Sequence, residues 1–197
     1  MISKILPNIT RILVAVLIIF CMGLSSCSTH RKTTKRGRYE KVHHKTKAEK
    51  EFEKKEEKIV TNIARHLKGE EKKIIQEAES WIGTPYKYAG QEKGEGADCS
   101  GFVMMVYKSA IHCDLPRNSA KQAEFCKKIR HSAVKPGDLV FFATGKDPDK
   151  VSHVGIMIDD KEFLHSSTSK GVLISSLDNK YYSDRLLSFG RVPCMNH

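Results

Sequence analysis

The pattern of apolar residues changes once along this chain, and that change is what most restricts its fold. Between residues 73 and 128 apolar side chains recur at helical intervals, which predicts helices at 73–81, 99–112 and 119–128. After the turn sequence at 136–138, short apolar runs predict strands at 139–142, 153–159, 162–167, 171–175 and 186–192. Helices first and strands afterwards favour an α+β fold, with N-terminal helices packed on an antiparallel β-sheet.

The first 27 residues have the features of an export signal. An apolar run at 12–24 follows Lys4 and Arg11 and is too short to span a bilayer comfortably. The run leads into Ser25-Ser26-Cys27, which looks like a bacterial lipobox, in which Cys27 is lipidated and becomes the first residue of the mature protein. The alternative is a short uncleaved anchor, or a plain signal peptide with an incidental cysteine. We therefore expect an exported protein with a signal peptide at 1–26.

A basic segment follows the signal. Residues 28–48 contain eight lysines and arginines against the single acid Glu40, a local balance of +7 in a chain whose net charge is +11. Few apolar side chains interrupt this charge, so we expect 27–48 to be a flexible tether rather than part of a core. We expect this tether to serve as a solvated spacer. In the alternative, it adheres to anionic lipid headgroups or to acidic wall polymers. Nucleic acid is not an expected partner outside the cytoplasm.

Residues 49–70 are expected to form a charged helical linker. Glutamates and lysines alternate there, and apolar side chains recur at roughly helical intervals from Phe52 to Leu67. Such a helix either packs on the following domain or stands off as a stalk. The remaining residues, 71–197, have the length of one ordinary domain, which we expect to be catalytic.

Chemistry is indicated by one cysteine and two histidines. Cys99 opens a predicted helix, where unpaired backbone N–H groups and the helix dipole favour a thiolate. His153 and His165 follow in predicted strands, and a Cys and a His far apart in sequence, with a third polar group to orient the imidazole, are typical of cysteine hydrolases. In the alternative, Cys99 is a small core residue and the histidines are structural. The residues alone predict thiol-dependent acyl transfer.

Several short motifs are spread along the chain: Trp81-Ile82-Gly83-Thr84-Pro85-Tyr86-Lys87-Tyr88, Asp98-Cys99-Ser100-Gly101, Leu115-Pro116-Arg117-Asn118-Ser119, Pro136-Gly137-Asp138-Leu139-Val140-Phe141-Phe142, His153-Val154-Gly155-Ile156 and Phe163-Leu164-His165-Ser166-Ser167. Their order and spacing resemble the NlpC-type family of bacterial cell-wall cysteine peptidases, and within it lipoprotein murein endopeptidases of the Spr type. One departure is Ala89-Gly90, where the family usually has paired glycines. The resemblance covers about residues 74–193 and implies a papain-like core.

The resemblance also implies a role for each candidate residue. Cys99 would be the nucleophile, His153 would form a thiolate–imidazolium pair with it, and His165 would orient His153. The backbone N–H of Cys99 and the side chain of Tyr86 would stabilise the oxyanion. Alternatively, His165 is a strand histidine that faces solvent, and Tyr86 is an ordinary buried aromatic residue.

Asp98, Arg117 and Ser119 resemble the positions with which the family recognises its wall peptide. Asp98 and Ser119 could equally be helix caps, and one residue can do both. The sequence contains no cluster with zinc-like ligand spacing, so no metal or other cofactor is expected.

Three cysteines remain once Cys21 leaves with the signal and Cys27 and Cys99 have their expected roles. They are Cys113, Cys126 and Cys194. An exported protein can form a disulfide, but the sequence does not say which two of these thiols would pair.

We therefore expect a lipid-anchored cysteine endopeptidase that hydrolyses peptidoglycan stem peptides or cross-links. The bond would be D-Glu–diaminopimelate or D-Ala–diaminopimelate. The protein would be a monomer, held by lipid at Cys27 and facing the cell wall in the periplasm, at the outer membrane. Two alternatives stay open: a papain-like amidase or acyltransferase that acts on another amide, and a non-catalytic lipoprotein that binds the wall.

Overall fold

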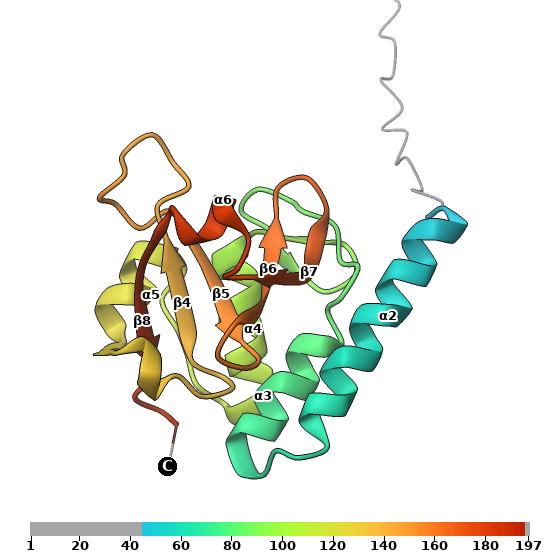
Figure 1. Cartoon of the computed structure of the whole chain (residues 1–197), viewed down its shortest axis with the longest axis horizontal. Coiled ribbons are helices and arrows are strands. Elements are labelled where there is room, and N and C mark those ends of the chain that lie inside the picture. Colours follow the sequence, from blue (N-terminus) through green and yellow to red (C-terminus); the bar gives the residue numbers. More distant parts are fainter. Residues whose placement is uncertain (1–44, 196–197) are drawn as a thin grey trace, which may run out of the picture. The chain divides into compact units, whose positions relative to one another are not determined.

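The computed structural model describes residues 45–195, and Figure 1 shows the order of their elements. The helices are α2 (Lys47–Ala64), α3 (Gly69–Glu79), α4 (Cys99–Ile111), α5 (Ser119–Phe125) and α6 (Lys180–Ser183). The strands are β1 (Gln91–Glu92), β2 (Gly96–Ala97), β3 (Lys127–Ile129), β4 (Leu139–Phe142), β5 (His153–Met157), β6 (Glu162–Ser167), β7 (Gly171–Ser176) and β8 (Leu186–Arg191). A short 3-10 turn, His131–Ala133, precedes β4.

Six of the strands form one antiparallel sheet in the order β3-β8-β4-β5-β6-β7. The consecutive strands β4 to β7 are neighbours, and β8 returns to pair with β4 on the other side. The strands β1 and β2 pair only with each other. Helices packed on an antiparallel sheet confirm the α+β class that the sequence predicts.

The sheet is buried on both faces. Figure 1 shows α4 behind β5 and β6, and on that side Phe102 and Tyr107 join a large apolar cluster. Successive side chains of a strand point to opposite faces, so Phe141 of β4 enters this cluster while Phe142 enters a second one on the other side, with Phe163. Each large apolar side chain buried in this way contributes about 1.5–3 kcal/mol. Burial on both faces explains the uninterrupted apolar run of β4.

A disulfide links the end of α4 to the C-terminal segment. The helix ends at His112, whose left-handed backbone (φ 56°) turns the chain into Cys113. Cys113 is bonded to Cys194, 81 residues later, and closing a loop of that length stabilises a fold by about 4 kcal/mol. This settles the pairing that the sequence left open. Within residues 45–195 the free thiols belong to Cys99 and Cys126.

The prediction of a helix over 119–128 is wrong at its end. The helix α5 stops at Phe125 because Cys126 is extended, and β3 then pairs with β8 at the edge of the sheet. Tertiary pairing overrides helical periodicity here. The short elements α6, β1 and β2 were not predicted, since none of them is long enough to show a period.

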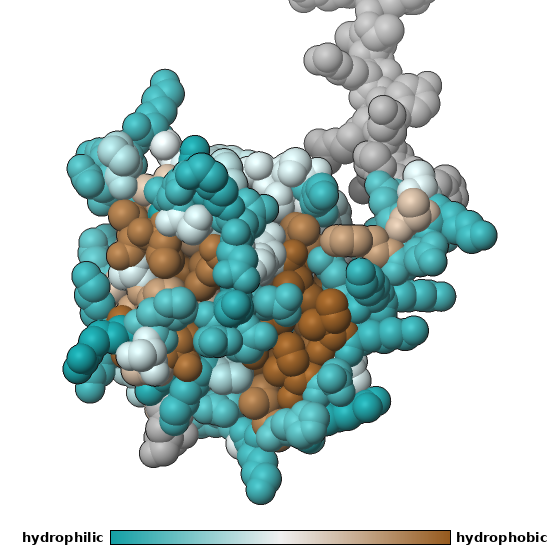
Figure 2. Space-filling view, viewed as in Figure 1, coloured by the Kyte–Doolittle hydropathy of each residue, from teal (hydrophilic) through white to brown (hydrophobic). Residues whose placement is uncertain are grey.

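The helix α2 packs on the domain rather than standing off as a stalk. Its residues Glu56, Val60 and Ala64 are buried, and it contacts α3 and β7. Hydrophilic side chains cover its outer face, and apolar side chains gather between it and the sheet (Figure 2). Its first turn is held by a capping box between Thr46 and Glu49. The stretch expected to be a linker therefore belongs to the same compact unit as the sheet.

One buried carboxyl group joins α2 to the edge of the sheet. Glu56 is 4% exposed, and its Oε1 accepts a hydrogen bond from the backbone N–H of Ile174 in β7 at 3.0 Å. Its Oε2 has no hydrogen-bond partner among the described residues. Burial raises the pKa of Glu56 to about 7, and nearby Glu53 adds to this, while the Ile174 bond and Lys170 act in the opposite direction. Glu56 thus gives the unpaired edge of β7 a hydrogen-bond partner, and its burial there disfavours the charged carboxylate.

No helix within residues 45–195 is long and apolar enough to cross a membrane. The expected signal peptide, the lipidation site at Cys27 and the tether up to residue 44 lie outside the described residues.

The ionisation of Glu56 predicts how stability depends on pH. An unfolded glutamate ionises near pH 4.5, whereas Glu56 in the folded protein keeps its proton up to about pH 7. The contribution of protonated Glu56 to the free energy of unfolding is therefore complete below pH 4.5. It is lost as the pH rises through 7, and the loss is up to about 3 kcal/mol. Urea unfolding at pH 5 and pH 8 should show that Glu56→Gln loses less stability over this interval than the wild type.

The matched control is Glu57→Gln, since Glu57 is the exposed neighbour on the same helix. It should keep the wild-type pH dependence. If Glu56→Gln and Glu57→Gln behave alike, the Glu56 carboxyl is not the group responsible.

Candidate active site

The residue Cys99 lies at the first position of α4, against β5. Asp98 caps the helix, since its Oδ1 accepts a hydrogen bond from the backbone N–H of Gly101 at 2.7 Å. The Cys99 side chain is half-buried, and hydrogen bonding by the backbone N–H groups of Val154, Ser100 and Cys99 itself acts to lower its pKa. Because Val154 follows His153 in β5, the thiol lies beside the strand that carries the first histidine.

The electrostatics of this pair differ from the sequence-based expectation. Burial raises the pKa of Cys99, and the charge of Asp98 adds to the effect, although the backbone hydrogen bonds oppose it. Burial also lowers the pKa of His153 to about 4. Each shift disfavours the charged form. The resting site therefore holds a neutral thiol and a neutral imidazole rather than the expected thiolate–imidazolium pair, because desolvation outweighs the helix start.

The sheet brings the two histidines together. His153 begins β5 and His165 lies in the neighbouring strand β6. The Nε2 atom of His153 is 2.9 Å from the Nδ1 atom of His165, and the rings are nearly perpendicular. His153 is 8% exposed and His165 only 1%, so the alternative of a solvent-facing strand histidine is wrong. Burial lowers the pKa of His165 well below its ordinary value, and His153 adds to this.

Two hydroxyl groups contact the far side of His165. The Nε2 atom of His165 is 2.9 Å from Ser175 Oγ in β7 and 3.2 Å from the hydroxyl of Tyr182 in α6. Sequence reasoning missed both residues. Nothing in the local pattern separates Ser175 from Ser176, and α6 is too short to be recognised before the fold is known.

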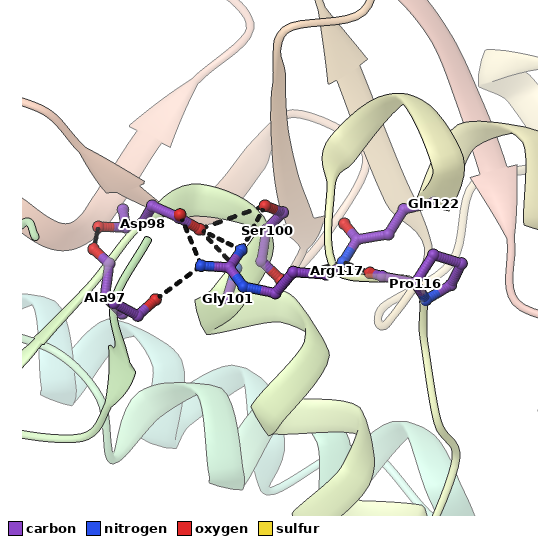
Figure 3. Close-up of polar contacts among 9 residues, drawn as sticks. Ala97, Asp98, Ser100, Gly101, Pro116, Arg117 and Gln122 are labelled. Carbon is purple, nitrogen blue, oxygen red and sulfur yellow. Dashed lines mark hydrogen bonds and ion pairs between the residues drawn. The ribbon is translucent and has the colours of Figure 1, made fainter. Parts of the chain in front are cut away.

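An ion pair supports the start of α4 (Figure 3). Arg117 binds Asp98 with both guanidinium branches, at 2.9 Å to Oδ1 and 2.7 Å to Oδ2. Arg117 also donates to the hydroxyl of Ser100 and to the carbonyl of Gly90. Burial alone would raise the pKa of Asp98, but the hydrogen bonds that Asp98 accepts from Arg117, Gly101 and Ser100 lower it. Asp98 is thus an ionised cap whose two oxygens are both engaged.

Ser119 is buried as the first residue of α5, but it is not the cap. Asn118 caps α5, accepting from the backbone N–H of Lys121 at 2.9 Å. Gln122 of the same helix donates to the carbonyls of Ser100 and Pro116, which ties α5 to the first turn of α4.

Tyr86 lies in a loop that crosses beside the thiol. Its backbone forms an isolated bridge with Ala97, and the side chain is half-buried. Burial raises the pKa of Tyr86, and the charges of Cys99, Asp98 and Tyr88 raise it further. Ala89 follows in the left-handed region at φ 57°, the conformation that a glycine adopts without strain. The chain thus keeps a glycine-like turn at the position where it departs from the family pattern.

No group of three or more His, Cys, Asp or Glu side chains within residues 45–195 is placed to hold a metal ion. The arrangement instead offers a thiol at a helix start, an imidazole in the strand that lies beside it and a second imidazole bonded to the first. That set can transfer an acyl group through a covalent intermediate.

Comparisons with known proteins agree with this geometry. The sequence model of the NlpC/P60 family matches residues 83–191. The chain is 42% identical over 119 residues to the probable endopeptidase NlpC of Escherichia coli K12. The aligned region covers 60% of this chain and 76% of that protein. It is 38% identical over 120 residues to murein DD-endopeptidase MepS/murein LD-carboxypeptidase of the same organism, covering 61% of this chain and 62% of that one.

Among solved structures, the fold is similar to that of an NlpC/P60 family protein from Bacillus cereus. The TM-score is 0.57 at 31% sequence identity, and the match covers 61% of this chain and 39% of the other.

The raised pKa of Cys99 predicts how the thiol reacts in the absence of substrate. Since the thiolate forms only above the ordinary range, iodoacetamide should label Cys99 slowly at pH 7, at a rate that still rises beyond pH 9. Mass spectrometry of digested protein would locate the label. Cys126, whose pKa burial raises to about 12, is the internal control and should stay unlabelled in the folded protein. A rate for Cys99 that is already constant below pH 7 would instead indicate a resting thiolate–imidazolium pair.

Proposed function

Because this chain belongs to the NlpC/P60 family and is a hydrolase of the cysteine peptidase class, we propose that it is a lipid-anchored endopeptidase that cuts peptidoglycan stem peptides or their cross-links. The observation that carries this proposal is the buried His153–His165 pair, joined by a hydrogen bond of 2.9 Å, in strands against which the helix that starts at Cys99 packs. A wall-binding protein that had lost catalysis would not need this arrangement.

The reaction begins with attack of the Cys99 sulfur on the peptide carbonyl. His153 takes the thiol proton as the carbon–sulfur bond forms, so that two neutral groups become charged only when the substrate is present. When the tetrahedral intermediate collapses, the carbon–nitrogen bond breaks and His153 gives the proton to the leaving amine. Water, deprotonated by His153, then hydrolyses the thioester and restores the thiol. In this scheme His165 orients His153.

The negative charge on the carbonyl oxygen is stabilised at the start of α4. The backbone N–H of Cys99 is one donor, since the first N–H groups of a helix lack intrahelical partners. The hydroxyl of Tyr86 is the second donor in the proposal, because the backbone of Tyr86 bridges to Ala97, two residues before Cys99.

Recognition of the wall peptide falls to the Asp98–Arg117 pair. The side chain of Arg117 is 38% exposed and that of Asp98 is 13% exposed, so the guanidinium is the more accessible partner for a carboxylate of the substrate. Asp98 supplies the opposite charge for an amine. Ser119 is buried, and its part in recognition rests on the resemblance alone.

The names of the relatives support the substrate class. NlpC of Escherichia coli is a probable endopeptidase and MepS is a murein DD-endopeptidase. The second name favours the D-Ala–diaminopimelate cross-link, although the D-Glu–diaminopimelate bond uses the same chemistry. The proposed anchor is lipid at Cys27, and the basic tether ends at residue 44, because residues 45–48 belong to the folded unit that begins with the cap of α2.

Purified muropeptides test the proposed reaction. The full chain should cleave them, and mass spectrometry of the fragments identifies the bond. Cys99→Ala should lower the rate by on the order of 10³-fold or more, because no nucleophile remains. The half-buried Cys99 makes no disulfide, so the melting temperature and circular dichroism spectrum should be nearly unchanged. Retained cleavage by Cys99→Ala would refute the mechanism, and an inactive wild type would favour another amide substrate.

The anchor is tested with labelled palmitate in cells. Wild-type protein should incorporate the label and fractionate with membranes, whereas Cys27→Ala should remain unlabelled and fractionate as soluble protein. The control is Cys21→Ala, which removes a thiol from the apolar run and should still be labelled. Equal labelling of Cys27→Ala and the wild type would rule out Cys27 as the lipidated residue.

A further inference from the structure

His165 is held from both sides. Within residues 45–195 its Nδ1 atom faces His153, and its Nε2 atom faces two hydroxyls, those of Ser175 and Tyr182. We infer that Ser175 and Tyr182 are positioning residues for the cleavage reaction, which hold His165 in the tautomer that keeps His153 able to accept a proton. The inference rests on the proposed roles of Cys99, His153 and His165.

The hydrogen bonds along this row of groups fix where each ring proton lies. The Nε2 atom of His153 is engaged by His165, so the thiol proton must go to Nδ1 of His153. Nδ1 can accept it only if the proton of neutral His153 is on Nε2, which then donates to Nδ1 of His165. His165 must therefore carry its own proton on Nε2, where Ser175 and Tyr182 accept it. In its opposite tautomer, His165 would carry its proton on Nδ1 and donate it to Nε2 of His153. The proton of neutral His153 would then be on Nδ1, which would leave no free lone pair to accept the proton of Cys99.

Burial makes the choice of tautomer decisive. His165 is 1% exposed and its pKa is lowered well below the ordinary value, so it stays neutral and holds one ring proton. No water-exposed face can exchange that proton freely. Each hydroxyl oxygen has lone pairs that can accept the proton on Nε2 of His165.

Two separate elements fix the hydroxyls in place. Tyr182 comes from α6, and its ring packs against those of Phe142, Phe163 and His165 at centroid distances of 5.4, 5.1 and 5.3 Å. Ser175 comes from β7, next to Ile174, whose backbone N–H is bound by Glu56 of α2. Neither hydroxyl therefore depends on a mobile loop for its position.

The same row of bonds serves the charged state of the reaction. When His153 takes the thiol proton it becomes an imidazolium, and its Nε2–H still donates to His165 without any proton leaving the row. The His165 Nε2–H donates onward to the two hydroxyl oxygens, so aligned dipoles stabilise a cation that no carboxylate of the described residues contacts.

The test uses Ser175→Ala, Tyr182→Phe and the double variant of the full chain. The control for the tyrosine is Tyr181→Phe, the same change in the adjacent and half-exposed residue. The control for the serine is Ser175→Thr, which keeps a hydroxyl and suits a strand. Nitrogen-15 NMR of labelled histidine reads the tautomers of His153 and His165 without any substrate, and muropeptide kinetics give kcat and KM.

Each single variant should lower kcat about threefold to tenfold, and the double variant at least about 100-fold, since a wrong tautomer disables the base. KM should change less than about twofold, since neither hydroxyl is proposed to touch the substrate. The double variant should lose the single Nε2–H form of His165 in the NMR spectrum. Ser175→Thr and Tyr181→Phe should match the wild type in both measurements.

Wild-type tautomers and a kcat within about twofold in the double variant would overturn the inference, as would a rise in KM alone. If the double variant does not fold, the difference between Ser175→Ala and Ser175→Thr decides alone. If neither the wild type nor any variant cleaves muropeptides but the NMR spectra change as expected, the proposed substrate is wrong and the positioning role stands.

Discussion

Exclusion of water from the His153–His165 pair is the constraint on which the rest of this structure depends. The two imidazoles meet at 2.9 Å in a site that leaves them 8% and 1% exposed. Burial there lowers both pKa values and raises that of Cys99, so the resting site holds no net charge among these three groups. Such a site can be buried without a counter-ion, and charge appears only when the thiol attacks. The aromatic residues Phe142 and Phe163 are what keep water away from the pair.

Every element near the site contributes to that arrangement. The neighbouring strands β5 and β6 bring the two imidazoles within 2.9 Å of each other, while α4 presents Cys99 from the face of the sheet on which this helix packs. Arg117 and Asp98 hold the first turn of that helix, and Glu56 holds the outer edge of β7. A catalytic geometry must be kept to a fraction of an ångström, which rigid elements achieve better than loops. The N-terminal helix α2 therefore supports the site through the sheet, although the family match begins only at residue 83.

The family relationship and the geometry answer different questions. Membership of the NlpC/P60 family assigns the class of enzyme, because the match spans most of the folded unit. It does not describe how a histidine can replace the carboxylate that usually orients a catalytic imidazole. The contacts of His165 with Ser175 and Tyr182 give a physical answer: neutral hydrogen-bond acceptors in a dry site can set a tautomer without introducing a charge.

The sequence by itself determined the class of fold and the start of α4 at Cys99, and it indicated Cys99, His153 and His165 as the candidate set, because helical and strand periods and a thiol–imidazole set are local or compositional features. It also predicted β4 to β8 within a few residues, since each contains several apolar residues and is bounded by turn residues. Only the tertiary structure decided that α5 ends at Phe125 and is followed by β3, that Cys113 pairs with Cys194 and that α2 packs on the sheet. The protonation of Cys99 and His153, and the hydroxyls behind His165, were likewise beyond the sequence. Each of these depends on burial or on contacts between residues distant in the chain, and a pattern of neighbours carries no information about either.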